Sequence, residues 1–118
     1  MARDEKIKIQ WEAIQNNISK KFGGGEKMDL DAIVFLIGIQ ELGKGYQKFG
    51  KDEKLNIMHI AICKLLEPFG YYEFDYFDDE GWPHYKAIEE LPNLKSGEQT
   101  ILMKEAVVLY FEQNESLI

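Results

Sequence analysis

A chain of 118 residues can build one hydrophobic core, and it leaves little room for a second domain. Its 45% hydrophobic and 30% charged residues are typical of a folded globular protein and exclude an intrinsically disordered one. The net charge of −7 argues against general nucleic-acid binding, because neutralising phosphates needs a basic surface. We therefore expect one folded domain over residues 1–118.

The composition also bears on where the protein works. The single cysteine, Cys63, cannot form an internal disulfide, which is typical of a reducing compartment. The start of the chain is charged and has no apolar segment behind it, unlike a secretory signal. The longest apolar run, 32–39, is shorter than the roughly 20 residues that span a bilayer. We expect a cytoplasmic protein without a membrane span.

The first predicted helix covers about 5–22, where apolar residues recur at spacings of three and four. Its stripe contains Ile7, Trp11, Ile14, Ile18 and Phe22. Three glycines, 23–25, end this helix in a turn, or they form a hinge that leaves 1–22 as an N-terminal arm.

The second predicted helix is the most apolar segment of the chain. It runs from a cap at Asp29 or Asp31 to about Leu42, and its centre, 32–39, is apolar on all sides. Such a run also fits a buried strand, but the acidic start and the end at 40–43 favour a helix. We expect Gly38 to let another helix approach closely.

Two more helices are predicted after a glycine-rich connection. The third covers about 53–67 with Asp52 as its cap, and the last begins after a turn at 94–97. In the last helix, Ser96 and Gln99 have the spacing of a capping box. The inward stripe of the third helix is expected to contain Leu55, Met58, Ile62, Leu65 and Leu66, widened by Ile57, Ile60 and Ala61.

The segment at about 71–88 differs in chemistry from the rest of the chain and is predicted to form an antiparallel β-hairpin. Eight of the chain's fifteen aromatic residues lie between Phe69 and Tyr85. Residues 70–91 carry seven acids and one base, so they supply −6 of the net charge of −7. We therefore expect an α+β fold that is mostly helical, with about four helices packed against one acidic, aromatic hairpin.

The register of the hairpin follows from a turn centred on Asp79 and Glu80, with Gly81 in the left-handed conformation that such turns need. Opposed residues are then complementary, and a slip of one residue would place charges on both faces, which argues against a bulge. The expected pairs are Phe77–Trp82, Tyr76–Pro83, Asp75–His84, Phe74–Tyr85, Glu73–Lys86 and Tyr72–Ala87. The face expected to pack on the helices contains Tyr72, Phe74, Tyr76, Pro83, Tyr85 and Ala87.

The tip of this hairpin is the candidate interaction surface, since exposed aromatics among acids are typical of a contact site. The alternative is that the aromatics of the tip cover the end of the core. The surface is expected to contain Phe77, Asp78, Asp79, Glu80, Trp82 and His84.

A second hypothesis is a small-ligand or enzyme site. An Asp75–His84 pair can orient an imidazole as a general base, with Tyr85 and His59 as further members. The pair lacks an accompanying nucleophile, and the sequence has no nucleophile elbow or phosphate-binding loop, so the residues favour a non-catalytic protein without a cofactor. His59 and Cys63 are four residues apart, but no complete ligand set accompanies them, and we expect no metal site.

A third hypothesis links the protein to nucleic acid. The segment 44–54 interleaves lysines with aromatics, which can bind phosphates and stack on bases. The residues concerned are Lys44, Tyr46, Lys48, Phe49, Lys51 and Lys54. The simpler interpretation is a loop whose aromatics pack into the core. Conversely, the acidic hairpin can imitate a phosphate backbone.

Three stretches resemble small bacterial cytoplasmic proteins of unknown function: FLIGIQELGKG (35–45), KDEKLNIMHIAICKLLEPFGYYEF (51–74) and GWPHYK (81–86). The resemblance implies a single bacterial cytoplasmic domain, and it implies no activity, cofactor or site residue. The residues themselves favour a non-catalytic accessory protein whose hairpin binds a basic protein surface or a second copy of the chain. The small-ligand or enzyme hypothesis and the nucleic-acid hypothesis stay open beside it.

Overall fold

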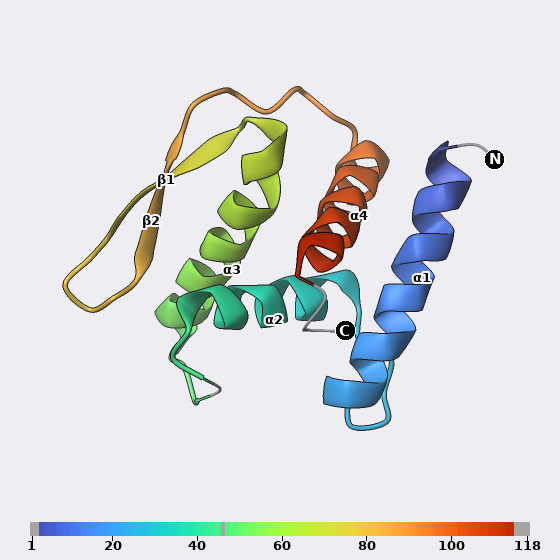
Figure 1. Cartoon of the computed structure of the whole chain (residues 1–118), viewed down its shortest axis with the longest axis horizontal. Coiled ribbons are helices and arrows are strands. Elements are labelled where there is room, and N and C mark those ends of the chain that lie inside the picture. Colours follow the sequence, from blue (N-terminus) through green and yellow to red (C-terminus); the bar gives the residue numbers. More distant parts are fainter. Residues whose placement is uncertain (1–2, 46, 115–118) are drawn as a thin grey trace. The chain divides into compact units, whose positions relative to one another are not determined.

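The structure is a computed structural model that describes residues 3–45 and 47–114, and side chains from residue 5 onward (Figure 1). Its helices are α1 (Arg3–Phe22), α2 (Leu30–Leu42), α3 (Lys51–Leu66) and α4 (Ser96–Gln113), with a short 3₁₀ helix, η1 (Glu67–Phe69), after α3. Strands β1 (Tyr72–Phe77) and β2 (Pro83–Ala87) pair antiparallel. The predicted mostly helical α+β fold is confirmed. No helix in the described ranges is long and apolar enough to cross a membrane.

The chain divides into two compact units. One contains residues 1–33 and 93–118, and so holds α1, the start of α2 and α4. The other contains residues 34–92 and holds the rest of α2, α3, η1 and the hairpin. The chain passes from one unit to the other inside α2. The expectations of a single domain and of a hinged arm at 1–22 stay predictions.

In the first unit, α1 packs against α4. The stripe predicted on α1 is confirmed at Trp11, Ile14 and Ile18, which are buried. Gln10 Nε2 donates a hydrogen bond to Glu112 Oε1 (3.3 Å) across the helix pair. The prediction is wrong at Phe22, which is 55% exposed because α1 ends there and the chain turns away.

The glycine turn after α1 is held by polar side chains of that helix. Gly24 and Gly25 have φ angles of 63° and 96°, which explains the glycine run. Ser19 is almost fully buried, and its Oγ accepts a hydrogen bond from the Met28 N–H (2.8 Å). Gln15 Nε2 donates to the Met28 carbonyl (2.7 Å). These bonds connect the chain beyond the turn to α1.

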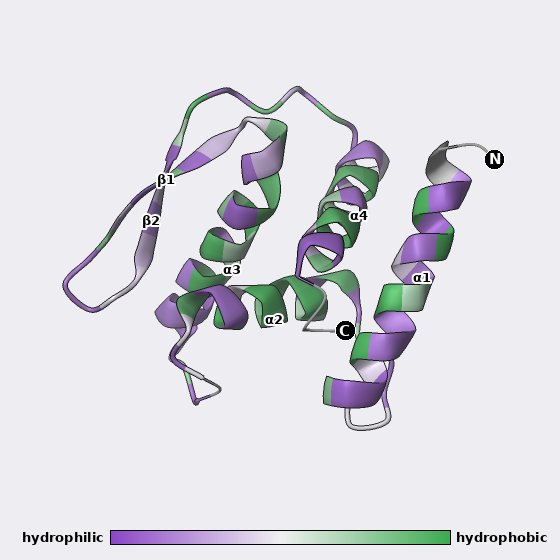
Figure 2. Cartoon of the chain, viewed as in Figure 1, coloured by the Kyte–Doolittle hydropathy of each residue, from purple (hydrophilic) through white to green (hydrophobic). Residues whose placement is uncertain are grey.

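Helix α2 begins with a side-chain cap, as predicted, since Asp29 Oδ1 accepts a hydrogen bond from the Ala32 N–H (2.8 Å). Figure 2 shows that α2 is hydrophobic over most of its length. In the second unit, α3 comes so close to Gly38 that a Cβ atom there would lie 2.5 Å from the Ile57 carbonyl oxygen. The prediction that Gly38 lets another helix approach is therefore confirmed.

The core of the second unit includes residues of α2, α3 and the loop between them. One cluster of this core contains the buried Ile39, Leu42, Phe49 and Ile57, and Phe35 and Trp82 pack against it. The stripe predicted for α3 is wrong at Leu55, which is 62% exposed. Because α3 is apolar on more than one side, its periodicity does not decide which side faces inward. The close contact between Ile57 and Gly38 decides it.

The start of α3 also differs from the prediction. Its N-cap is Gly50, and Asp52 lies inside the first turn. Glu53 Oε1 accepts a hydrogen bond from the Gly50 N–H (3.0 Å), so a side chain from within the helix satisfies this backbone group.

The hairpin contains a β-bulge, contrary to the prediction. The pairs Tyr72–Ala87, Glu73–Lys86 and Phe74–Tyr85 are confirmed. Beyond them Asp75 is an extra residue in β1, and the register shifts by one. The other three predicted pairs are wrong, and the structure has Tyr76–His84 and Phe77–Pro83 in their place.

The length of the turn is the cause of this shift. The Asp78 N–H donates to the Trp82 carbonyl (3.0 Å), and the Gly81 N–H donates to the Asp78 carbonyl (2.9 Å). The turn therefore comprises residues 79–81, and Gly81 has the positive φ angle that was predicted, 85°. The bulge at Asp75 absorbs the additional turn residue, so that the pairs closer to η1 keep their register.

Candidate functional site

Asp78 organises the turn of the hairpin. Its Oδ1 accepts hydrogen bonds from the backbone N–H groups of Glu80 and Trp82, both at 2.9 Å. Its Oδ2 lies 2.9 Å from His84 Nε2. The hydrogen bond with His84, followed by the one from the Trp82 N–H, lowers the pKa of the Asp78 carboxyl. A residue predicted to lie on the interaction surface thus has a structural role.

The predicted Asp75–His84 pair is wrong, because the bulge places His84 opposite Tyr76. The rings of these two residues stack, with centroids 4.7 Å apart and planes inclined by 5°. The acid that contacts His84 is Asp78. His84 is still exposed, so it lies on the surface where it was expected.

Trp82 is the second residue whose predicted place changes. It was expected at the exposed tip, but it is only partly exposed and packs against the core that contains Leu42 and Phe49. The Lys44 amino group lies 5.6 Å from the centre of its ring, in a cation–π contact. Trp82 therefore anchors the hairpin to the second unit, which is the alternative that the sequence left open.

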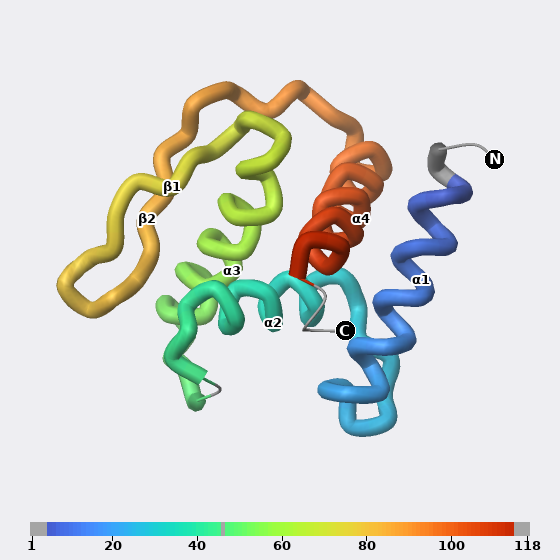
Figure 3. The backbone as a smooth tube through the Cα atoms, viewed as in Figure 1, coloured from blue at the N-terminus to red at the C-terminus, as the bar shows by residue number. Residues whose placement is uncertain are grey.

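Large aromatic side chains of β1 are exposed instead. Phe77 is 64% exposed, as predicted. Phe74 and Tyr76 were expected to pack on the helices, but they are 42% and 51% exposed. The hairpin runs beside α3 (Figure 3). Within β1, Tyr72 is half-buried and the other five residues are exposed. Sheet alternation alone could not show that most of this strand stays in solvent.

Two of the exposed aromatics, Phe74 and Phe77, are in mutual contact, whereas Tyr76 stacks on His84. Because the bulge adds one residue to β1, Phe74 and Phe77 lie on the same face, with ring centroids 4.9 Å apart. The edge of the Phe74 ring also meets Tyr85, at 5.9 Å between centroids. We call the exposed Phe74, Tyr76 and Phe77 the aromatic strand surface, in which Phe74 and Phe77 lie on one face of the hairpin and Tyr76 on the other.

Acids surround the aromatic strand surface. Asp75, Asp79 and Glu80 are exposed. Glu73 Oε1 lies 2.9 Å from Lys86 Nζ, and this contact raises the pKa of the Lys86 amino group. Two of the predicted surface residues, Asp79 and Glu80, are thus accessible together with Phe77.

Both edges of the hairpin carry features that hinder pairing with a further strand. On β1, the Phe74 N–H already donates to Glu67 Oε2 (3.2 Å). On β2, Pro83 has no N–H to offer. The bulge at Asp75 further disturbs the edge of β1.

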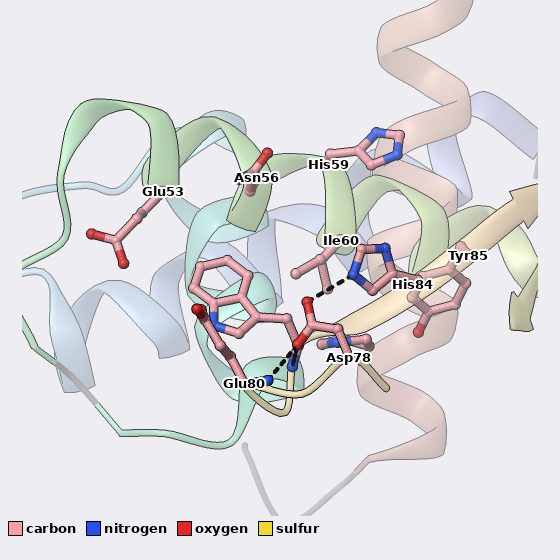
Figure 4. Close-up of a pocket in the computed structure, with 10 residues that line it drawn as sticks. Glu53, Asn56, His59, Ile60, Asp78, Glu80, His84 and Tyr85 are labelled. Atoms are coloured by element: carbon pink, nitrogen blue, oxygen red, sulfur yellow. Dashed lines mark hydrogen bonds and ion pairs between the residues drawn. The ribbon is translucent and has the colours of Figure 1, made fainter. Parts of the chain in front are cut away.

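Two hollows border the hairpin. The first, of about 240 Å³, lies against Phe74, Phe77 and Tyr85, and residues such as Lys64 and Glu67 also line it. The second, of about 280 Å³, lies between α3 and the hairpin (Figure 4). His59, His84 and Tyr85 of the predicted ligand site do line this second hollow, while Asp78 takes the place of Asp75.

The thiol of Cys63 is not suited to chemistry. His59 Nε2 lies 3.5 Å from its sulfur, but burial raises the pKa of Cys63 to about 11. No group of three or more His, Cys, Asp or Glu side chains that can hold a metal ion occurs among the described residues.

Among the described residues of the basic segment 44–54, no exposed aromatic side chain lies between the lysines. Phe49 is buried, and Lys44 lies over Trp82. Lys48, Lys51 and Lys54 are exposed, whereas Tyr46 lies outside the described residues. The aromatic that is described packs in the core, in accord with the simpler interpretation.

Comparisons with known protein families, with curated proteins and with solved structures found no match to this chain.

Proposed function

We propose that the protein is a non-catalytic accessory protein of the cytoplasm, whose hairpin docks on the basic surface of a partner protein. The observation that supports this most is the aromatic strand surface. Single exposed apolar residues are ordinary, whereas two Phe rings in contact, Phe74 at 42% and Phe77 at 64% exposure, are typical of contact sites. Tyr76, 51% exposed, adds a third ring on the other face of the strand. Phe and Tyr also bury much area at little cost in side-chain entropy, which suits a binding anchor.

Charge favours a basic partner over a second copy of the chain. Residues 70–91 supply −6 of the net charge of −7. Two hairpins docked on each other would bring these acids together, and like charges across an interface cost free energy. A basic surface would instead be attracted to the exposed Asp75, Asp79 and Glu80.

The edges of the hairpin indicate how docking takes place. Strand addition needs a row of available N–H and C=O groups, and the bond from Phe74 to Glu67, the bulge and Pro83 interrupt these rows. We therefore infer that the partner contacts the side chains of the aromatic strand surface.

The test is affinity purification of the intact chain from its source cells, followed by titration with the purified partner. The variant to compare with wild type combines Phe77→Ala with Asp79→Lys, because both residues are exposed and neither holds the turn through its side chain. We expect a protein with a basic surface to bind wild type, and its binding to the variant to fall by about tenfold or more.

The matched control combines Leu55→Ala with Glu12→Lys, which removes an equally exposed apolar side chain and reverses one exposed acid outside residues 70–91. This control should bind the partner like wild type. Equal capture by wild type and the Phe77 and Asp79 variant would overturn the proposal, as would a bound protein with no basic surface.

A further inference from the structure

The hollow between α3 and the hairpin has the features of a binding site that is separate from the aromatic strand surface. Its volume is about 280 Å³, close to the lower limit for small-ligand pockets. Figure 4 shows Glu53, Asn56 and His59 projecting from α3, and Asp78, Glu80 and His84 on the opposite side. None of Phe74, Tyr76 and Phe77 lines it, so this cavity goes beyond the proposed function, although Glu80 belongs to both sites.

The lining of this cavity is apolar at its base and acidic at its rim. Ile60 and Pro83 are buried there, whereas Glu53 and Glu80 are exposed. Its lining includes three carboxylates, with Asp78 as the third, and no Lys or Arg. An anionic ligand is therefore disfavoured, and a ligand with an apolar stem and a cationic head fits the walls.

Acceptor groups at the rim are available to such a head. The side chains of Glu80 and Asn56 make no hydrogen bond to another residue in the described part of the chain. Glu53 uses Oε1 for the Gly50 N–H. Asp78, in contrast, is engaged with the turn and with His84. A guanidinium or ammonium group can donate to several acceptors of this kind at once.

The chain itself places a cation beside one wall of the cavity. The Lys44 amino group lies 5.6 Å from the centre of the Trp82 ring, and that ring is part of the cavity lining. Lys44 is not among the lining residues, so its contact leaves the cavity open. A tryptophan ring in a cavity wall favours a cationic group over a neutral one, whereas the charge of Lys44 opposes it, so the rim carboxylates have to outweigh that repulsion.

From these observations we propose that the cavity between α3 and the hairpin binds an organic cation, an alkylguanidinium or alkylammonium group. Its stem lies over Ile60 and Pro83, and its head is held by Glu53, Glu80 and the Asn56 amide oxygen. A metal ion is a poorer fit, because the described side chains form no group of three or more metal ligands. The cation can belong to a free amine or to a basic side chain of another protein.

The test is an NMR titration of the isotope-labelled intact chain with N-acetylarginine amide and N-acetyllysine amide. We expect saturable shifts of the Trp82 indole N–H and the Asn56 side-chain amide. Glu53→Gln combined with Glu80→Gln should weaken binding of the cationic probes by about tenfold, since two negative charges are removed. The side-chain oxygen at position 53 can still accept the hydrogen bond from the Gly50 N–H, so the start of α3 is preserved. A dispersed spectrum of this variant would show that it is folded.

Neutral and inorganic ligands serve as controls. N-acetylleucine amide should leave both signals unmoved, and so should Ca²⁺ at the same concentration. Equal shifts with either one, no shift with the cationic probes, or undiminished binding by the Gln variant would overturn the proposal. Agmatine and a short Arg-containing peptide then distinguish the sources. Tighter binding of agmatine supports a free amine, and tighter binding of the peptide supports a protein side chain.

Discussion

At the scale of single residues, Asp78 connects the geometry of the turn to pH. It holds two backbone N–H groups with one oxygen and His84 with the other. Because folding lowers the pKa of the Asp78 carboxyl, its ionised form stabilises the native state at pH values above the pKa it has in the unfolded chain. This stabilisation is lost as the pH falls through the pKa that Asp78 has in the folded protein. Since the pair is largely in solvent, the effect on stability is small, and the titration itself is the better measurement.

We predict that His84→Ala raises the pKa of Asp78 toward the ordinary value for aspartate, because its largest cause of lowering is removed. The two N–H bonds of the turn remain, so part of the lowering should persist. The measurement is the pH titration of the Asp78 carboxyl carbon by NMR in both proteins. Identical titration curves would contradict the assigned cause.

At the scale of elements, the contact between α2 and α3 leaves no space at Gly38. A Cβ atom at position 38 would lie 2.5 Å from the carbonyl oxygen of Ile57 and 2.6 Å from the Cγ2 atom of the same residue. We predict that Gly38→Ala destabilises the protein by about 1–3 kcal/mol, because overpacking outweighs the better helix propensity of alanine. Urea unfolding followed by circular dichroism measures the change.

The matched control is Gly97→Ala in α4, where an added Cβ would meet no atom within 4 Å. There the helix propensity of alanine acts alone, so stability should stay the same or rise by up to about 1 kcal/mol. A similar loss of unfolding free energy in both variants would show that the close contact with Ile57 is not the cause of the effect at Gly38.

The hairpin contains one anchor and one exposed aromatic that can be compared directly. Trp82 packs on the core, whereas Phe77 is 64% exposed. We predict that Trp82→Ala costs about 2–3 kcal/mol of stability, somewhat less than for a fully buried tryptophan. Phe77→Ala should change it by no more than about 0.5 kcal/mol. Thermal and urea unfolding of both variants test this contrast, and equal losses would contradict it.

Part of the hairpin could be predicted from its residues, and part could not. Glu73 with Lys86 and Phe74 with Tyr85 are complementary across strands, and this pattern was enough to pair them correctly. The sequence around Gly81, however, fits turns of two or three residues, and only the second requires the bulge at Asp75.

The candidate site was harder to predict than the fold, because it depends on how the hairpin packs. Alternation along a strand assigns Trp82 to the same face as Lys86, but it does not say that a core cluster will lie beside it. Likewise, Asp78 replaced Asp75 as the partner of His84 through the shift of one residue. That Leu55 is exposed while Ile57, also predicted to face inward, is buried required knowledge of the contact with Gly38.

At the scale of the whole molecule, the charge distribution predicts the oligomeric state. The hairpin should repel its own copies, since residues 70–91, which contain it, carry −6 of the net −7. We predict that the protein elutes as a monomer of 13.7 kDa in size-exclusion chromatography with light scattering, at moderate salt. A dimer whose formation is lost with Phe77→Ala would instead assign the aromatic strand surface to self-association.

The first unit draws its helices from distant parts of the chain, and this has a consequence for the order of folding. Gln10 and Glu112, which bond across α1 and α4, are 102 residues apart. Closing so long a loop costs entropy, whereas residues 34–92 are continuous and can associate locally. During synthesis, α1 leaves the ribosome before α4, so Trp11, Ile14 and Ile18 lack their contacts with that helix until it follows. We expect this helix to be the segment that chaperones bind in the nascent chain.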